Sequence, residues 1–88
     1  MESDLDKEFN EAFYRISMLE ESIAPDIMLK FYAYNKQANF GNKFSFNDEH
    51  NVRSAFKLNA WMQLNGMKSD VAKQEYINLA KTVLNTKQ

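Results

Sequence analysis

The sequence predicts an all-helical protein on three observations. The 88 residues include only two Gly and one Pro, which leaves little material for the tight turns of a small β-protein. Apolar residues recur in several segments at the three- and four-residue spacing of a helix that buries one face. Seven Phe, four Tyr, one Trp and five Met supply bulky side chains for a core. We therefore expect one domain spanning residues 1–88.

Two helices are predicted in the first third of the chain. The first covers about residues 5–21, because Phe9 and Ile16 belong to a series of apolar residues at helical spacing among charged ones. The second covers residues 25–40. Its initial proline suits the first turn of a helix, and Gly41 is a natural stop.

Two more helices are predicted towards the end of the chain, over about residues 52–64 and 69–84. Gly66 is expected to close the first of them. Ser69 is expected to cap the second, and its apolar stripe includes Tyr76. Four helices are therefore predicted in all.

The segment between the second and third predicted helices is interpreted as a loop that packs Phe44 and Phe46 onto the core. It also holds the chain's only histidine, His50, beside Asp48 and Glu49. A metal site needs several ligands, and no catalytic motif surrounds this histidine. We therefore predict no metal site, no catalytic residue and no enzymatic activity.

The composition also indicates a cellular location. The chain has no Cys, whereas small secreted domains usually depend on disulfides. Its first residues, Met-Glu-Ser-Asp, are acidic where a secretory signal would be basic and then apolar. No stretch approaches the roughly 20 apolar residues of a membrane span. We expect a cytoplasmic monomer that is not inserted in a membrane.

The charges are unevenly distributed along the chain, although the net charge is only −1. Residues 1–26 hold eight acidic and two basic residues, whereas residues 27–88 hold four acidic and nine basic ones. A basic part on a nearly neutral protein suits a small anionic ligand better than nucleic acid, which usually requires a strongly basic face.

One stripe of the second predicted helix changes from apolar to cationic along its length. Met28, Tyr32, Asn35 and Lys36 fall at positions i, i+4, i+7 and i+8, so they share a face. An ordinary amphipathic helix with polar ends in water explains this stripe. A groove wall for a ligand with an apolar tail and an anionic head explains it too, and the spacing alone leaves both open.

Residues 28–41 have the sequence MLKFYAYNKQANFG, residues 56–61 have FKLNAW, and residues 65–77 contain a Gly, an Ala and a Tyr-Ile pair in that order. These segments resemble three successive motifs of the acyl-CoA-binding protein family. The motifs are Met-Leu-x-x-Tyr-x-x-Tyr-Lys-Gln-Ala-x-x-Gly, then Ala-Lys-Trp-x-Ala-Trp, then a Lys-Gly, Ala, Tyr-Ile pattern. The resemblance extends over about residues 5–84.

The resemblance implies an up-down-down-up bundle of four helices with the ligand in a shallow bowl. It implies that the nucleotide end of coenzyme A, chiefly its 3′-phosphate and adenine, is bound by Tyr32, Lys36, Lys57 and Tyr76. Ammonium groups suit a phosphate, and tyrosines offer an aromatic face and a hydroxyl donor.

The acyl chain is expected to lie against apolar side chains at the positions that the resemblance implies. These are Met28, Leu29 and Ala12, with Phe13 as a further candidate. Trp61 and Phe31 are expected in the core.

Several positions depart from the family pattern. Asn35 replaces a tyrosine, so an amide can still form a hydrogen bond there but the aromatic contact is lost. Leu58 replaces a tryptophan and Phe56 a small residue. Ser17 stands where some members carry a basic residue, and Arg15 lies nearby.

The resemblance implies a carrier that binds, buffers and transports medium- to long-chain acyl-CoA esters inside the cell without changing them. Acyl-CoA is then a bound ligand, and no cofactor is expected. The alternative is a helical protein-interaction module that has kept the fold but lost the ligand.

Overall fold

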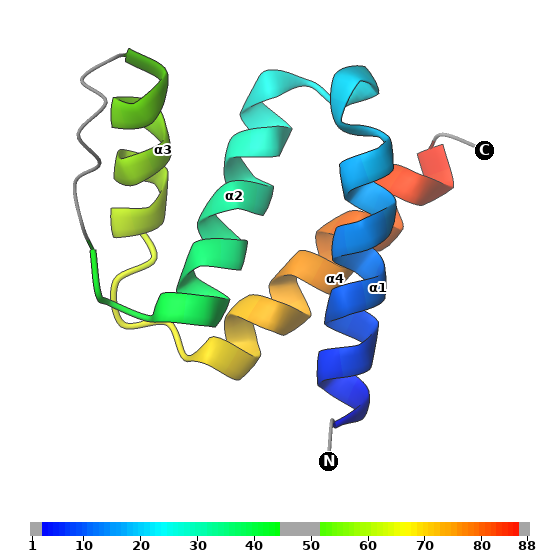
Figure 1. The fold of residues 1–88 in the computed structure, drawn as a ribbon, viewed down its shortest axis with the longest axis horizontal. Helices are drawn as coiled ribbons and strands as arrows, with labels where there is room; N and C mark the ends of the chain where they lie inside the picture. Colours follow the sequence, from blue (N-terminus) through cyan, green and yellow to red (C-terminus); the bar gives the residue numbers. More distant parts are fainter. Residues whose placement is uncertain (1–2, 45–51, 87–88) are drawn as a thin grey trace.

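The computed structural model describes residues 3–44 and 52–86, and within them it contains four α-helices and one short 3-10 helix. The bounds, in chain order, are α1 (Asp4–Met18), η1 (Glu20–Ser22), α2 (Pro25–Phe40), α3 (Val52–Met62) and α4 (Ser69–Thr86). In Figure 1, α1 rises from the N-terminus, α2 and α3 both descend, and α4 rises again. The predicted all-α, up-down-down-up fold is confirmed.

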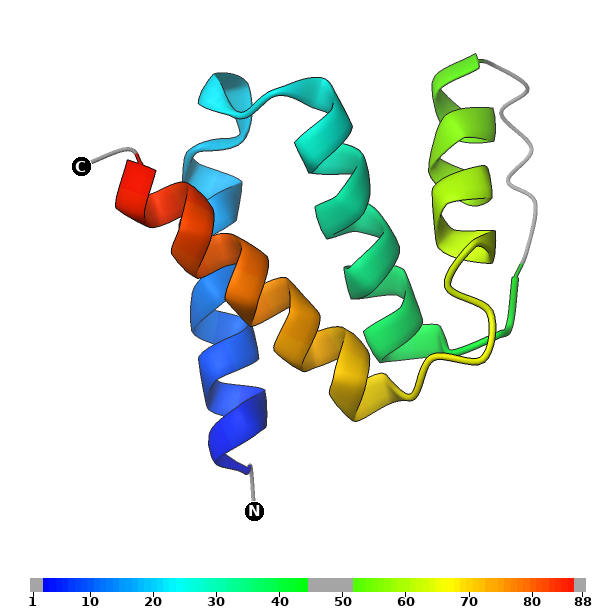
Figure 2. The ribbon, with the colours of Figure 1, turned by 180° about the vertical axis from the view of Figure 1, so that it is seen from behind.

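Helix α4 lies against two of the other helices. It packs against both α1 and α2, while α3 packs against α2. Figure 2 shows α4 crossing diagonally in front of α1, with α3 at the far end of the molecule beyond α2. The result is a flattened shape with principal extents of 36 × 32 × 18 Å.

Local sequence explains where α1 and α2 begin and end. The Ser3 hydroxyl accepts a hydrogen bond from the Asp6 backbone N–H at 3.1 Å and caps α1. Helix α2 starts with Pro25 in its first turn and ends at Gly41, whose φ of +59° is readily adopted only by glycine. These are the bounds that the sequence predicts for this helix.

Three details of the other helices differ from expectation. Helix α1 ends at Met18, because the next residues form the 3-10 turn of η1 instead of continuing the helix. Helix α3 ends at Met62, and Gly66, with φ +92°, lies in the turn that follows it. Ser69 is not a cap of α4: it is the first helical residue, and its hydroxyl donates to the Ala38 carbonyl at 2.6 Å, tying α4 to α2.

The main core lies between α1, α2 and α4. Its largest fully buried members are Ile16, Phe31 and Tyr76, one from each helix. The Tyr76 ring has its centroid 5.1 Å from that of Phe9 and 4.9 Å from that of Phe31. Such aromatic pairs contribute beyond the area that they bury. Phe31 is therefore a core residue, as expected.

A second, smaller buried region lies between α2 and α3. Trp61 is buried there, and its ring packs edge-on against Phe44 with centroids 5.0 Å apart. Both residues are thus packed as the sequence predicts, while Phe46 and His50 lie outside the described residues. Among the described residues, no helix combines the length and the apolar character needed to cross a membrane.

Candidate ligand-binding site on α2 and α3

Two lysine ammonium groups from different helices lie over the same tyrosine ring. The Nζ atom of Lys36, on α2, is 5.6 Å from the centroid of the Tyr32 ring, and Nζ of Lys57, on α3, is 5.3 Å from it. Both distances fall within the range of a cation–π interaction, which contributes about 0.5–1 kcal/mol at an exposed site. The structure therefore brings together three of the predicted ligand-binding residues.

Lys36 is also surrounded by two further aromatic rings. Its Nζ atom lies 4.9 Å from the centroid of Phe40 and 5.8 Å from that of Trp61. The Trp61 ring thus has two roles, because it fills the region between α2 and α3 and also forms one side of the Lys36 surroundings. Aromatic rings attract the ammonium group without neutralising its charge.

No carboxylate neutralises these lysines within the described part of the chain. The ion pairs found there are Glu11–Arg15 and Asp6–Lys73. Neither pair includes Lys36 or Lys57, so the ammonium donors of both are available to an anion. Burial raises the pKa of Tyr32 above its ordinary value, so its hydroxyl stays protonated and can donate a hydrogen bond.

Asn35 directly precedes Lys36 in α2, and its side chain forms a hydrogen bond with another residue of the same helix. Its side-chain oxygen accepts a hydrogen bond from Nδ2 of Asn39 at 2.9 Å. Tyr34 does not replace the missing tyrosine, because its side chain is half-buried and packs against the main core. The bond with Asn39 uses the amide oxygen of Asn35, whereas its amide nitrogen, which would donate to a phosphate, takes no part in it.

The predicted acyl-chain residues of α2 lie nearer the start of this helix. Met28 and Leu29 are both half-buried, and Met28 packs against the main core. Phe13 of α1 is 44% exposed, and its ring centroid lies 6.3 Å from that of Tyr76. These side chains offer apolar surface that is only partly covered in the protein.

Two predicted site residues are almost completely buried. Tyr76 is 2% exposed, and burial raises its pKa well above the ordinary value. Its ring packs among Phe9, Phe13 and Phe31 and is almost fully covered, so stacking on adenine is not available to it, and its hydroxyl stays the predicted ligand contact. Ala12 is 8% exposed, belongs to α1 and lines a groove between α1 and α4.

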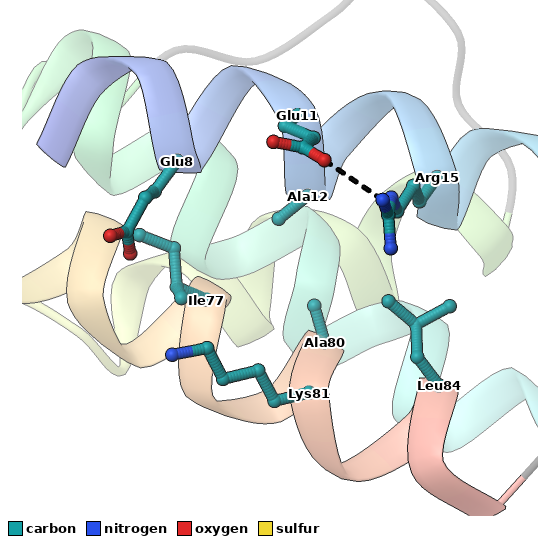
Figure 3. A pocket seen from close by; sticks show the side chains of 8 residues that line it. All are labelled: Glu8, Glu11, Ala12, Arg15, Ile77, Ala80, Lys81 and Leu84. Carbon is teal, nitrogen blue, oxygen red and sulfur yellow. Dashed lines mark ion pairs between the residues drawn. The ribbon is translucent and has the colours of Figure 1, made fainter. Parts of the chain in front are cut away.

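The groove that Ala12 helps to form is separate from the lysine cluster. It has a volume of about 240 Å³, and all its lining residues belong to α1 and α4. Figure 3 shows an apolar floor with charged side chains at the rim, where Arg15 pairs with Glu11. Arg15 is therefore directed to this groove and does not take the place of a basic residue at Ser17.

Residues 6–80 match the family model described as "Acyl CoA binding protein". The match covers most of the chain. The chain belongs to the acyl-CoA-binding protein family. The fold is also similar to the crystal structure of acyl-CoA-binding protein 2 from rice (Oryza sativa), with a TM-score of 0.83 and 26% sequence identity. That match covers 93% of this chain and 92% of the rice chain.

Membership of the acyl-CoA-binding protein family implies binding and transport of acyl-CoA esters. Members of the family are carriers that do not catalyse a reaction. In the described residues, no group of three or more His, Asp or Glu side chains is placed to hold a metal ion.

Two residues close to the lysines of this acyl-CoA-binding protein have no role in the sequence-based prediction. Phe40 follows Lys36 by four residues, a spacing that brings side chains together on a helix, so this contact could have been predicted. Gln37 is completely buried and bonded to residues of two distant segments. The sequence holds no local signal for those bonds.

Proposed function

We propose that this protein binds medium- to long-chain acyl-CoA esters through the cluster of Tyr32, Lys36 and Lys57, and carries them unchanged. The observation that supports this most strongly is the convergence of two ammonium groups, from two helices, on one tyrosine ring without a described acidic partner. The two lysines would neutralise the 3′-phosphate, and the hydroxyl of Tyr32 would donate to it or to the adenine. Asn35 and the hydroxyl of Tyr76 are the further proposed contacts of the nucleotide end.

The acyl chain would lie on Met28 and Leu29, whose partly exposed apolar surface it would cover. Each buried methylene contributes about 0.8 kcal/mol, so affinity should rise with chain length until the apolar surface is used up. The contact of Ala12 with the chain stays a prediction, because this residue lies in the groove between α1 and α4.

The remaining parts of the proposal concern the protein as a whole. Residues 1–88 would act as a single domain and a monomer in the cytoplasm, where the protein would buffer free acyl-CoA. The absence of Cys suits a reducing compartment. Sedimentation equilibrium over a range of protein concentrations would test the monomer, because self-association raises the apparent mass with concentration.

One observation favours a second candidate function, a helical interaction module that no longer binds acyl-CoA. Asn35 stands where the family motif has a tyrosine, and its amide bonds to Asn39. A protein released from ligand binding could lose this aromatic contact without cost.

Ligand-dependent thermal stabilisation separates the two functions. A ligand that binds only the folded state at 100 times its Kd raises the free energy of unfolding by about 2.7 kcal/mol. For a domain of this size the melting temperature should therefore rise by about 10 °C or more with palmitoyl-CoA. Analysis of the ligand afterwards should show an intact thioester.

The Lys36→Ala/Lys57→Ala double variant is the matched control, and it should show a much smaller rise. If palmitoyl-CoA leaves the melting temperature of the unaltered protein unchanged, the carrier function is wrong and the interaction module takes its place.

A further inference from the structure

The side chain of Gln37 joins the end of α2 to the end of α3 and to the turn before α4. Its Nε2 donates to the Met67 carbonyl at 2.7 Å and to Oδ1 of Asn42 at 3.0 Å. Its Oε1 accepts from Nε1 of Trp61 at 3.2 Å. Both amide protons and the amide oxygen are therefore used, as a completely buried amide requires.

The neighbours of Gln37 extend this junction. Nε1 of Trp61 also donates to the Gly41 carbonyl at 3.0 Å, and Oδ1 of Asn42 also accepts from the Gly66 backbone N–H at 3.0 Å. The junction thus connects the end of α2, the end of α3 and the turn between α3 and α4. It lies at the lower end of α2 and α3 in Figure 1, where the two helices come closest to the start of α4.

The junction links helix α3 to helix α2. Helix α3 packs on α2, and it lies at the edge of the molecule on the side away from α1. Trp61 is the buried residue of α3, and the two hydrogen bonds of its indole N–H go to Gln37 and Gly41. A change at Gln37 that shifts Trp61 would therefore also shift Lys57, which lies one turn earlier in α3.

We propose that Gln37 is a positioning residue for ligand binding, which holds α3 on α2 so that Lys57 and Lys36 converge on Tyr32. This proposal rests on the proposed function, because it treats the two lysines as one anion-binding site. Gln37 is completely buried, so its effect on the ligand would be indirect. Its effect is transmitted through Trp61, which also lies next to the Lys36 ammonium.

The chemistry of the junction explains why an apolar side chain would not serve. Methionine matches glutamine in length, but it would take the Gln37 donor from the Met67 carbonyl and one of two donors from Oδ1 of Asn42. It would also remove the amide oxygen that accepts from Nε1 of Trp61. Polar groups inside a protein that lose a partner shift towards water or towards other partners. The turn before α4 and the ring of Trp61 would therefore move, and the separation of the two lysines would no longer be fixed.

A comparison of lysine deletions in two backgrounds tests this role. In the unaltered protein, Lys57→Ala should weaken palmitoyl-CoA binding by about tenfold or more, as expected for a charge-assisted hydrogen bond. In the Gln37→Met background the same deletion should cost less than about threefold, because Lys57 is already misplaced. The preference for palmitoyl-CoA over its 3′-dephospho analogue should fall in parallel.

Ile16→Val is the matched control for a general loss of stability. Ile16 is completely buried in the main core and belongs to α1, far from α3 in the fold. This variant should lower the melting temperature but leave the cost of Lys57→Ala unchanged. Circular dichroism should show that each variant is folded at the assay temperature.

Asn42→Ala provides a second variant in case Gln37→Met does not fold. Asn42 is exposed, so its removal weakens the junction without opening the core. The cost of Lys57→Ala should fall in the same direction, by a smaller factor. An unchanged cost of Lys57→Ala in a folded junction variant overturns the role of Gln37. If the unaltered protein does not bind palmitoyl-CoA at all, the proposed function is wrong and this proposal falls with it.

Discussion

At the scale of single residues, the binding proposal depends on the surroundings of one ammonium group. Lys36 lies among the rings of Tyr32, Phe40 and Trp61, and these rings hold its long side chain in place in the free protein. A side chain that is already ordered loses less rotamer freedom when it binds an anion. In the proposed binding mode, the aromatic surroundings would therefore prepare Lys36 for a phosphate.

Replacing Lys36 by alanine should weaken acyl-CoA binding by about 1.5–3 kcal/mol, roughly ten- to a hundredfold. The reason is the loss of a charge-assisted hydrogen bond to phosphate. The loss should be smaller for a ligand without the 3′-phosphate, and titration calorimetry with both ligands measures the difference. Equal losses for the two ligands would show that Lys36 has a different role.

The residues of the site differ in how far the sequence could predict them. Met28, Tyr32 and Lys36 share a stripe because helical spacing alone places them there. The approach of Lys57 to Tyr32 was expected only from the family resemblance. The bond between Gln37 and Trp61 joins residues 24 positions apart, so it exists only after α3 has packed on α2. No local pattern could predict it.

At the scale of secondary-structure elements, α2 carries most of the proposed site and has two buried faces. Phe31 and Ala38 face the main core, whereas Gln37 faces the junction with Trp61. The bounds of α2 were predictable because a proline and a glycine mark them. The end of α1 carries no such residue, so the change from an α-helix to the 3-10 turn of η1 was missed.

Gly41→Ala should reduce the free energy of unfolding by about 1–3 kcal/mol. Nothing lies within 4 Å of the added Cβ atom, so the cost arises from the backbone, which has φ +59° and ψ −134°. Urea denaturation measures this change. Asn59→Ala, at an exposed position within α3, is the control and should change stability little. If Gly41→Ala is as stable as the control, the backbone argument is wrong.

At the scale of the whole molecule, the arrangement depends on contacts that join distant parts of the chain. One of them is an ion pair between α1 and α4, in which Nζ of Lys73 lies 2.6 Å from Oδ1 of Asp6. The hydrogen bond from Lys73, with a second one from Ser3, holds the pKa of the Asp6 carboxyl below its ordinary value. Periodicity predicted both helices but could not show which charges on them would meet.

The lowered pKa of Asp6 makes a prediction about stability and pH. A carboxyl whose pKa is lower in the folded state stabilises the fold above its unfolded pKa, and this effect is lost as the pH falls through the folded pKa. Asp6→Asn should therefore lower the melting temperature at neutral pH, and the difference should vanish towards about pH 2. Glu11→Gln, which breaks an exposed pair within α1, should have a smaller effect. A difference that does not depend on pH would contradict the assignment.

The central claim is that the whole ligand, both its nucleotide end and its acyl chain, is recognised by this protein. Isothermal titration with palmitoyl-CoA tests it most directly, with free coenzyme A and free palmitate as controls. The proposal predicts one-to-one binding of the ester that is far tighter than the binding of either fragment. Absence of binding, or binding of palmitate as tightly as of the ester, would contradict it.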